Sequence, residues 1–299
     1  MRQAFVDKVF ADKTLIVIQA ANNILEEYNA QGLVLTLRQL YYQFVARGLL
    51  PNKQSEYKRL GSIINDARLA GYIDWSMLED RTRYLRKPPS WESPSAIMSA
   101  VAKQYREDLW ASQTHRPEVW IEKDALIGVI ERACDDLRVP YFACRGYASQ
   151  TSQYDAGMRL AGYIGKQKQS PIIFHLGDHD PSGMDMTRDN KERVRMFMGW
   201  RVPVIRLALN MDQIQQYNPP PNPAKETDSR SSSYINEYGT ESWELDALEP
   251  SVIDRLIRDA IEPLIDRRKW NSAVRKENIN RGLLKKVSGR WEDVKDFLK

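Results

Sequence analysis

The sequence predicts an α/β protein, in which a mostly parallel sheet lies between a domain of short helices and a helical C-terminal extension. Short apolar runs alternate with amphipathic helices through the middle of the chain, which is the pattern of a parallel sheet. Glycines interrupt a helical periodicity before that region, and helical periodicity returns after it. The chain has 299 residues, a length that favours two domains.

The N-terminal part is predicted to contain three helices. The first covers residues 4–30, the second covers residues 37–48 with Thr36 as its N-cap, and the third covers residues 55–70. A short turn separates the second helix from the third, which is typical of a helix-turn-helix. Residues 72–86 are then expected to form the wing of a winged helix.

These helices define the first predicted boundaries. An N-terminal helical segment covers residues 1–30, and a winged-helix domain covers residues 31–95. We expect Lys58, Arg59 and Arg68, on the third helix, to contact the phosphates of double-stranded DNA. A plain helical hairpin is the alternative interpretation.

The central domain is predicted to cover residues 96–210. Its strand candidates are residues 119–121, 139–144, 171–176 and 202–208. Helices near residues 126–137 and 153–166 separate the first three of them. Right-handed crossovers through these helices would make the strands parallel.

Two of the predicted strands end in acidic residues. Glu122 follows the first strand, and Asp178 and Asp180 follow the third, just before a Pro-Ser-Gly turn. The carboxyl ends of parallel strands meet at one edge, where open α/β sheets bind ligands. Carboxylate oxygens at such an edge suit Mg²⁺. The alternative is that the aspartates cap a helix or stabilise a turn.

The C-terminal part, residues 211–299, is predicted to be a long loop followed by helices. Residues 218–233 are rich in proline and serine and are expected to lack regular structure. From Arg267 to the C-terminus there are eleven basic residues and four acidic ones. Basic ends around an acidic centre favour a metal site flanked by phosphate-binding surfaces, and solvated helix faces are the alternative.

The composition is that of a soluble globular protein with a formal net charge of +4. No apolar run approaches the roughly 20 residues that span a bilayer, and Asp7 interrupts the start of the chain where a signal peptide would become apolar. We therefore expect a cytoplasmic, nucleoid-associated protein with no membrane partner. Cys134 and Cys144 lack metal-ligand spacing and are expected to be buried free thiols.

The acidic motifs carry a resemblance to a known domain. A strand followed by Glu122, and a later strand followed by Asp178-His179-Asp180-Pro181-Ser182-Gly183, resembles a Toprim domain, which has a Rossmann-like, mostly parallel sheet. The intervening Arg-Gly-Tyr-Ala loop, residues 145–148, most resembles the topoisomerase VI A subunit and its meiotic double-strand-break relative. The resemblance implies that Glu122, Asp178 and Asp180 bind Mg²⁺ and that Glu122 belongs to the catalytic site.

The segment Thr-Leu-Arg-Gln-Leu-Tyr-Tyr, residues 36–42, is similar to the Arg-x-x-Tyr-Tyr segment of the same family. The resemblance implies that Tyr42 attacks a DNA phosphate and that Arg38 helps to position it. Arg38 lies four residues before Tyr42 and so on the same helix face. The alternative is that Tyr42 belongs to the hydrophobic core, because tyrosine pairs on helices often pack there.

Three functions follow from these observations. The first is Mg²⁺-dependent DNA strand cleavage by transesterification through Tyr42. The second is a Toprim endonuclease that hydrolyses DNA with metal-activated water, and the third is a non-catalytic DNA-binding protein. We also expect a homodimer, because one site cuts one strand; in the related A subunits, the tyrosine of one protomer meets the metal site of the other. The resemblance also implies a possible partner, a separate ATPase subunit; the chain itself departs from an ATPase in having no Gly-rich phosphate loop.

Overall fold

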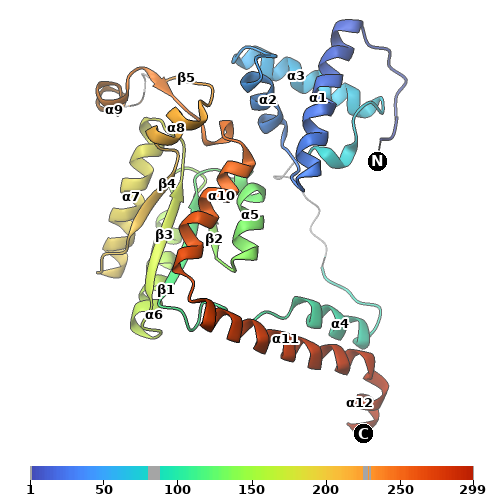
Figure 1. The fold of residues 1–299 in the computed structure, drawn as a ribbon, viewed down its shortest axis with the longest axis vertical. Helices are drawn as coiled ribbons and strands as arrows, with labels where there is room; N and C mark the ends of the chain where they lie inside the picture. The colour runs from blue at the N-terminus through green and yellow to red at the C-terminus, as the bar shows by residue number, and fades with distance from the viewer. Residues whose placement is uncertain (1, 80–87, 225–227, 229, 299) are drawn as a thin grey trace.

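A computed structural model of the chain describes residues 2–79, 88–224, 228 and 230–298. Its centre is a four-stranded sheet with the order β2-β1-β3-β4, in which every neighbouring pair is parallel (Figure 1). The strands are β1 (His115–Ile121), β2 (Tyr141–Ala143), β3 (Ser170–Leu176) and β4 (Val204–Ala208). Each overlaps a run that the sequence predicts as a strand. The mixed α/β class and the parallel sheet are therefore confirmed.

Helices cover both faces of the sheet. Side chains alternate between the two faces along each strand, so one strand contributes apolar side chains to a hydrophobic core on each face. On β1, Val119 and Ile121 join one hydrophobic core and Trp120 joins the other. The first face is covered by α5 (Ile127–Asp136) and α10 (Pro250–Ile261), and the second by α6 (Gln150–Gly165) and α7 (Pro181–Met198). A short 3-10 helix, η2 (Asp124–Leu126), connects β1 to α5. The two strands that end in acids, β1 and β3, are the central ones.

The N-terminal helices have a core of their own. They are α1 (Asp12–Ala30), α2 (Leu37–Ala46) and α3 (Gln54–Leu69). Thr36 caps α2 as predicted, and it forms a capping box with Gln39. Ala247, from the C-terminal part of the chain, joins this core and ties the N-terminal helices to the segment that follows the sheet.

The prediction of a helix from residue 4 is wrong, because α1 begins only at Asp12. The Phe5 and Val6 N–H groups instead donate to the Leu69 carbonyl oxygen, at 2.7 and 3.2 Å, at the end of α3. The apolar side chains here do not mark a buried helix face, since Phe5 is 60% exposed and Val9 is 91% exposed. The periodic pattern thus arose in an extended segment that satisfies the last turn of another helix.

Part of the predicted wing, residues 80–87, lies outside the described residues. In the described part, η1 (Trp75–Met77) follows α3, and Leu78 forms an isolated parallel bridge with Leu35. This bridge returns the chain to the start of α2.

The segment after β4 is more regular than the sequence predicts. It contains α8 (Met211–Tyr217), β5 (Asn222–Pro223), α9 (Ser231–Tyr238), β6 (Glu241–Ser242) and η3 (Leu245–Ala247). The prediction that residues 218–233 lack regular structure is therefore wrong at β5 and at the start of α9. Pro223 is tolerated because β5 belongs to a ribbon of two strands, whose outer edges need no donor.

The C-terminal extension is helical, as predicted, and forms an arm (Figure 1). Its elements are η4 (Glu262–Leu264), α11 (Arg267–Gly289) and α12 (Trp291–Phe297), and α4 (Pro94–Gln104) packs along α11. Ser95 and Ser288 exchange hydrogen bonds between side-chain hydroxyl and carbonyl oxygen, at 2.8 and 3.1 Å. The pair of helices therefore has a defined register.

The cysteines behave as predicted. Cys134 and Cys144 are buried free thiols, and burial raises the pKa of each to about 12, so neither is a nucleophile at neutral pH. Across the part of the chain that the structure describes, no helix combines the length and apolar character needed to cross a membrane.

Candidate functional site

The carboxyl ends of the two central strands bring Glu122 and Asp178 together. Glu122 follows β1, and Asp178 follows β3 after Gly177. The Asp178 N–H donates to Glu122 Oε2 at 2.9 Å, and both side chains are buried. A Cβ atom on Gly177 would lie only 2.9 Å from the same oxygen, so the glycine leaves room for this contact. Two acids that are far apart in the sequence thus meet at one edge of the sheet.

Holding these acids together is electrostatically costly. Burial, reinforced by the charge of Asp178, raises the pKa of Glu122 to about 7. Burial also raises the pKa of Asp178, although the ammonium group of Lys123 opposes that shift. Both carboxyl groups would therefore be stabilised by an additional cation.

Lys123 supplies part of the compensating charge. Its Nζ lies 2.8 Å from Asp178 Oδ2, 3.1 Å from Glu244 Oε2 and 3.2 Å from Asp246 Oδ1. Burial by itself would lower the pKa of Lys123, but the three carboxylates outweigh it and raise the pKa. Lys123 therefore remains protonated and connects the ends of β1 and β3 to the segment around η3.

Asp180 has a different environment. It is the N-cap of α7, and its Oδ1 accepts hydrogen bonds from the Gly183 N–H at 2.6 Å and the Ser182 hydroxyl at 3.1 Å. A Cβ atom on Gly183 would collide with the Asp178 carbonyl oxygen, so glycine is required for this tight turn. The helix-cap interpretation thus describes the present contacts of Asp180, whereas Asp178 faces Lys123.

Among the described residues, no three His, Cys, Asp or Glu side chains are arranged to hold a metal ion. The contacts above explain this, since Lys123 pairs with Asp178 and Asp180 caps its helix. The donor chemistry nevertheless fits Mg²⁺, because Glu122 and Asp178 offer hard oxygen ligands whose mutual repulsion a cation would relieve. Glu122 and Asp178 would hold the ion, joined by Asp180 where its side chain leaves the cap.

Tyr42 lines a pocket of about 340 Å³ together with Arg38, Asn222 and Glu244. Its side chain is buried, and burial together with Glu244 raises its pKa to about 12, while Arg38 opposes the shift. Arg38 bonds to Glu244, and its Nε lies 3.3 Å from Asp246 Oδ2. The phenol is therefore neutral and lies beside a carboxylate and a guanidinium group. The guanidinium group is suited to stabilise the anion that forms when the phenol loses its proton, and the carboxylate is an acceptor for that proton within the same pocket.

Tyr41 has a structural role. Its hydroxyl accepts a hydrogen bond from the Lys53 N–H at 2.8 Å and lies 3.1 Å from the Lys53 carbonyl oxygen. Its ring packs edge-on against Tyr57, with 5.4 Å between the ring centroids. Tyr41 thus fixes the turn between α2 and α3, and its neighbour Tyr42 points about 100° away around the helix.

A continuous series of ion pairs joins the tyrosine pocket to the acidic edge. Arg38 bonds to Glu244, Glu244 bonds to Lys123, and Lys123 bonds to Asp178. All of these residues belong to one copy of the chain. The structure thus brings together Arg38, Tyr42, Glu122 and Asp178, which the sequence predicts from two separate segments.

Sequence reasoning missed three members of this cluster, namely Lys123, Glu244 and Asp246. Lys123 directly follows Glu122, and this adjacency was the only signal for it. Glu244 and Asp246 lie in an acidic and apolar segment to which no role could be assigned, because their partners are more than a hundred residues away.

The three predicted DNA-binding residues differ in their contacts. Lys58 is exposed, and Arg59 pairs with Glu56 at 2.6 Å on the same helix. Arg68 is turned inward. Its guanidinium donates to the carbonyl oxygens of Trp75 and Leu78, each at 3.1 Å, and burial lowers its pKa. Lys58 and Arg59 are therefore the members of this set that are available to a partner.

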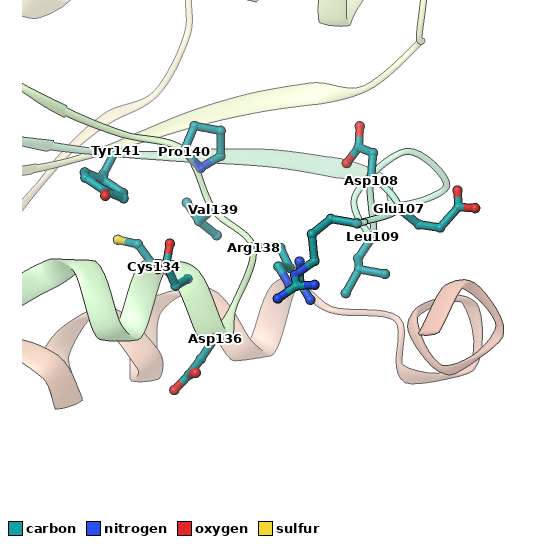
Figure 2. A pocket seen from close by; sticks show the side chains of 11 residues that line it. Glu107, Asp108, Leu109, Cys134, Asp136, Arg138, Val139, Pro140 and Tyr141 are labelled. Atoms are coloured by element: carbon teal, nitrogen blue, oxygen red, sulfur yellow. The ribbon is translucent and has the colours of Figure 1, made fainter. Parts of the chain in front are cut away.

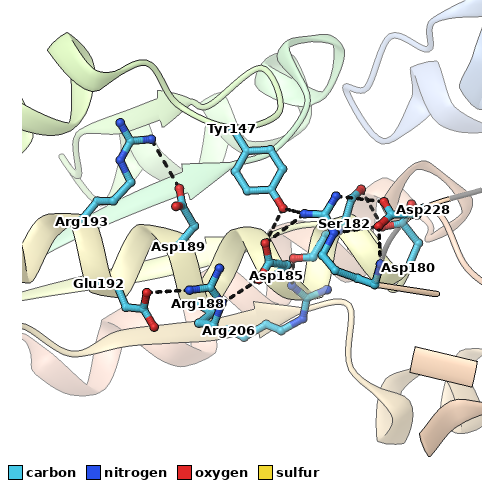
Figure 3. A network of polar contacts seen from close by, with 12 residues as sticks. Tyr147, Asp180, Ser182, Asp185, Arg188, Asp189, Glu192, Arg193, Arg206 and Asp228 are labelled. Carbon is cyan, nitrogen blue, oxygen red and sulfur yellow. Dashed lines mark hydrogen bonds and ion pairs between the residues drawn. The ribbon is translucent and has the colours of Figure 1, made fainter. Parts of the chain in front are cut away.

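Figure 3 shows the polar network beside the acidic edge. The hydroxyl of Tyr147, in the predicted 145–148 loop, donates to Asp185 Oδ2 at 2.6 Å, and Arg230 contacts both of these residues. Arg206 donates to the Asp178 carbonyl oxygen at 2.5 Å. The network thus fixes the loop and the turn that surround the acids.

Another cavity, of about 840 Å³, lies at the amino end of β2 (Figure 2). It is lined by charges of both signs, among them Glu107, Asp136 and Arg138. It contains none of the predicted site residues, and ligand sites of open α/β sheets lie at the opposite, carboxyl ends of the strands. We therefore assign the candidate site to the tyrosine pocket and the acidic edge.

Comparisons with known proteins do not assign the chain to a family. No family model matches the chain, and no curated protein matches it significantly.

Proposed function

We propose that the protein cleaves DNA strands in a Mg²⁺-dependent reaction, by transesterification through Tyr42. One observation carries the proposal: the series of ion pairs from Arg38 through Glu244 and Lys123 to Asp178. It connects a tyrosine with a proton acceptor to paired acids with the chemistry of a Mg²⁺ site. Transesterification requires both parts within reach of one phosphodiester.

In this mechanism Tyr42 attacks the phosphorus atom and forms a phosphotyrosyl ester, while the bond to one sugar oxygen breaks. Glu244 accepts the phenolic proton; its pKa is lowered because Lys123 and Arg38 outweigh burial, so it is ionised at neutral pH. Arg38 stabilises the developing charge on the phenolic and phosphate oxygens. The departing sugar oxygen takes a proton from solvent. Mg²⁺ held by Glu122 and Asp178 would supply a Lewis acid for a phosphate oxygen.

The finer description of the fold belongs to the same proposal. We infer that residues 31–95 form a winged-helix domain and that the sheet, within residues 96–210, is a Toprim domain. The similarity of both motifs to the topoisomerase VI A subunit supports this inference, as does the position of the acids after the two central strands. An ATPase in a separate subunit remains an expected partner.

Hydrolysis is the second candidate function, and the burial of Tyr42 favours it. A tyrosine that is 4% exposed and has a pKa of about 12 is a weak nucleophile unless the pocket opens. In a hydrolytic mechanism the acidic edge would activate water, and Tyr42 would serve only packing.

An assay with end-labelled duplex DNA and Mg²⁺ separates these functions. Denaturing with detergent during the reaction should trap a labelled protein if Tyr42 forms the ester. Free cut ends with unlabelled protein would identify a hydrolase. Shifted but uncut DNA would identify a binding protein, and would contradict both cleavage mechanisms.

We expect the double variant Lys58→Ala/Arg59→Ala to bind duplex DNA more weakly, across unrelated sequences. Each lost phosphate contact should reduce the slope of log affinity against log salt concentration by about 0.9. The matched control is Lys13→Ala/Lys166→Ala, which removes the same charge from exposed positions elsewhere. Equal affinities and slopes for the two double variants would exclude α3 as the DNA-binding surface.

A homodimer is proposed because cutting both strands requires two sites. The resemblance implies sites shared between protomers, whereas the ion pairs within one chain support a site built by a single protomer. We therefore expect mixed dimers of the Tyr42→Phe and Asp178→Asn proteins to stay inactive, since each protomer lacks one group. Cleavage by mixed dimers that are shown to form would establish shared sites instead.

A further inference from the structure

The outer face of α11 carries a row of basic side chains, which we call the basic stripe: Arg268, Arg275, Lys286 and Arg290. Their spacings of 7, 11 and 4 residues are close to whole helical turns, so all four lie within about 60° around the helix axis. The stripe extends over about 33 Å at 1.5 Å per residue. None of its members forms an ion pair with another described residue, and all four are exposed.

The acid of α11 lies on the other side of the helix. Glu277 is buried, pairs with Arg138 and Arg281, and accepts a hydrogen bond from the Glu107 N–H at 2.9 Å. That side packs against α4 and against the segment between α4 and β1 that contains Glu107, so it anchors α11 to the body of the protein. The outward side is left with positive charge alone.

The charges of the stripe are only partly balanced within the helix. Arg268 lies in the first turn, where a cation opposes the helix dipole, and the N-cap carboxylate of Asp266 is the acid beside that turn. Lys286 and Arg290 lie at the C-terminal end, where cations favour the helix dipole, but as like charges at a spacing of four residues they repel each other. An external anion along this face would relieve that repulsion.

We propose that the basic stripe binds the phosphate backbone of double-stranded DNA, as a surface separate from the winged helix and from the cleavage site. Its length of about 33 Å is close to one turn of duplex, about 34 Å, so a helix laid along one face of the duplex would bring the four side chains to phosphates on both sides of a groove. The arm projects from the sheet (Figure 1), and all four side chains of the stripe are exposed. The choice of DNA as the bound polyanion rests on the proposed function. The residues of the basic stripe are separate from those of the proposed cleavage site and of the winged helix.

An anionic membrane surface fits the stripe less well. A helix that lies in a membrane interface inserts a continuous apolar face. On α11 the apolar and buried side is already packed against α4, and the exposed side offers only Ile279 and Leu283 between the basic residues. Charge without an insertable face favours the duplex.

The test compares two triple variants of the full chain by fluorescence anisotropy, with a labelled 30-base-pair duplex in EDTA so that cleavage does not occur. Arg275→Gln/Lys286→Gln/Arg290→Gln removes the stripe, and glutamine preserves helix propensity. Lys13→Gln/Lys166→Gln/Arg201→Gln removes the same charge from other exposed positions. Circular dichroism should show equal helix content in both.

The salt slope is the slope of log affinity against log salt concentration. We expect it to be smaller in magnitude by about 2.7 in the stripe variant than in the control variant, or about 0.9 for each lost contact. Equal slopes for the two variants, or no binding by the wild type at low salt, would overturn the proposal. Loss of binding to phosphatidylserine vesicles with an unchanged DNA slope would overturn it as well. If the wild type cuts DNA and the stripe variant has the same salt slope as the control variant, only the DNA-binding role of the stripe is refuted. Binding through the stripe without cleavage refutes only the proposed function.

Discussion

Tyr42→Phe is expected to abolish DNA cleavage while preserving the fold and DNA binding. The substitution removes the hydroxyl that lies beside Arg38 and Glu244, and it leaves the packing of the ring unchanged. Because the hydroxyl has charged and polar partners in this pocket, the free energy of unfolding should fall by about 1–3 kcal/mol. Cleavage of labelled duplex and urea unfolding measure the two effects.

Tyr41→Phe is the control, and it is expected to cut DNA as the wild type does. It removes the hydroxyl that accepts from the Lys53 N–H, but this N–H keeps the Pro51 carbonyl oxygen as an acceptor at 2.9 Å, so the loss of stability should be about 0.5–1.5 kcal/mol, and the reacting groups are not touched. If the Tyr42→Phe protein still cuts DNA with Mg²⁺, Tyr42 belongs to the core and the enzyme is a hydrolase. Loss of cleavage in Tyr41→Phe alone would assign the nucleophile to the other tyrosine.

Glu122→Gln and Asp178→Asn are both expected to abolish cleavage and the rise in melting temperature that Mg²⁺ gives the wild type. Without Mg²⁺ neither should unfold the protein, because burial raises the pKa of each carboxyl group and so disfavours its charged form. Glu122→Gln removes a charge that burial and Asp178 disfavour, and so should stabilise the protein at pH 8. Asp178→Asn also removes a charge that burial disfavours, but it takes one of three carboxylates from Lys123, so it should stabilise the protein less than Glu122→Gln does. Thermal melts with and without Mg²⁺ measure these differences.

The pH dependence of the free energy of unfolding provides a control for the Glu122→Gln and Asp178→Asn variants. The pKa of Glu122 is about 7 in the folded protein, above its value of about 4.3 in an unfolded chain. Its contribution to stability is therefore full below about pH 4.3 and is lost as the pH rises through 7. Metal-free wild type should lose stability over that range, and Glu122→Gln should lose less. Equal pH profiles, with equal Mg²⁺ responses in all three proteins, would contradict the assigned metal site.

The sheet could be predicted because its information is local. Each strand is an apolar run, each crossover helix has its own periodicity, and right-handed connections make the strands parallel. That topology alone brings Glu122 beside Asp178. The short segments Asn222–Pro223 and Glu241–Ser242 could not be predicted, because their strand character depends on pairing with each other.

The electrostatic environment of the site could not be predicted from the sequence. Lys123 lies between three carboxylates, and two of these come from a segment whose position depends on the packing of the whole chain. For the same reason, local spacing did not distinguish Asp178, which faces Lys123, from Asp180, which caps α7. The apolar pattern of residues 4–10 predicted a helix that the structure does not contain, since an extended segment happens to carry apolar side chains at helical spacing.

Mass spectrometry of the protein trapped on DNA tests the central claim most directly. Wild-type protein would be incubated with duplex DNA and Mg²⁺, denatured, and digested with nuclease and trypsin. We expect a nucleotide remnant on the peptide that contains Tyr42, and no remnant in the Asp178→Asn protein. Cut DNA without any remnant on Tyr42, or a remnant on a different residue, would contradict cleavage through Tyr42.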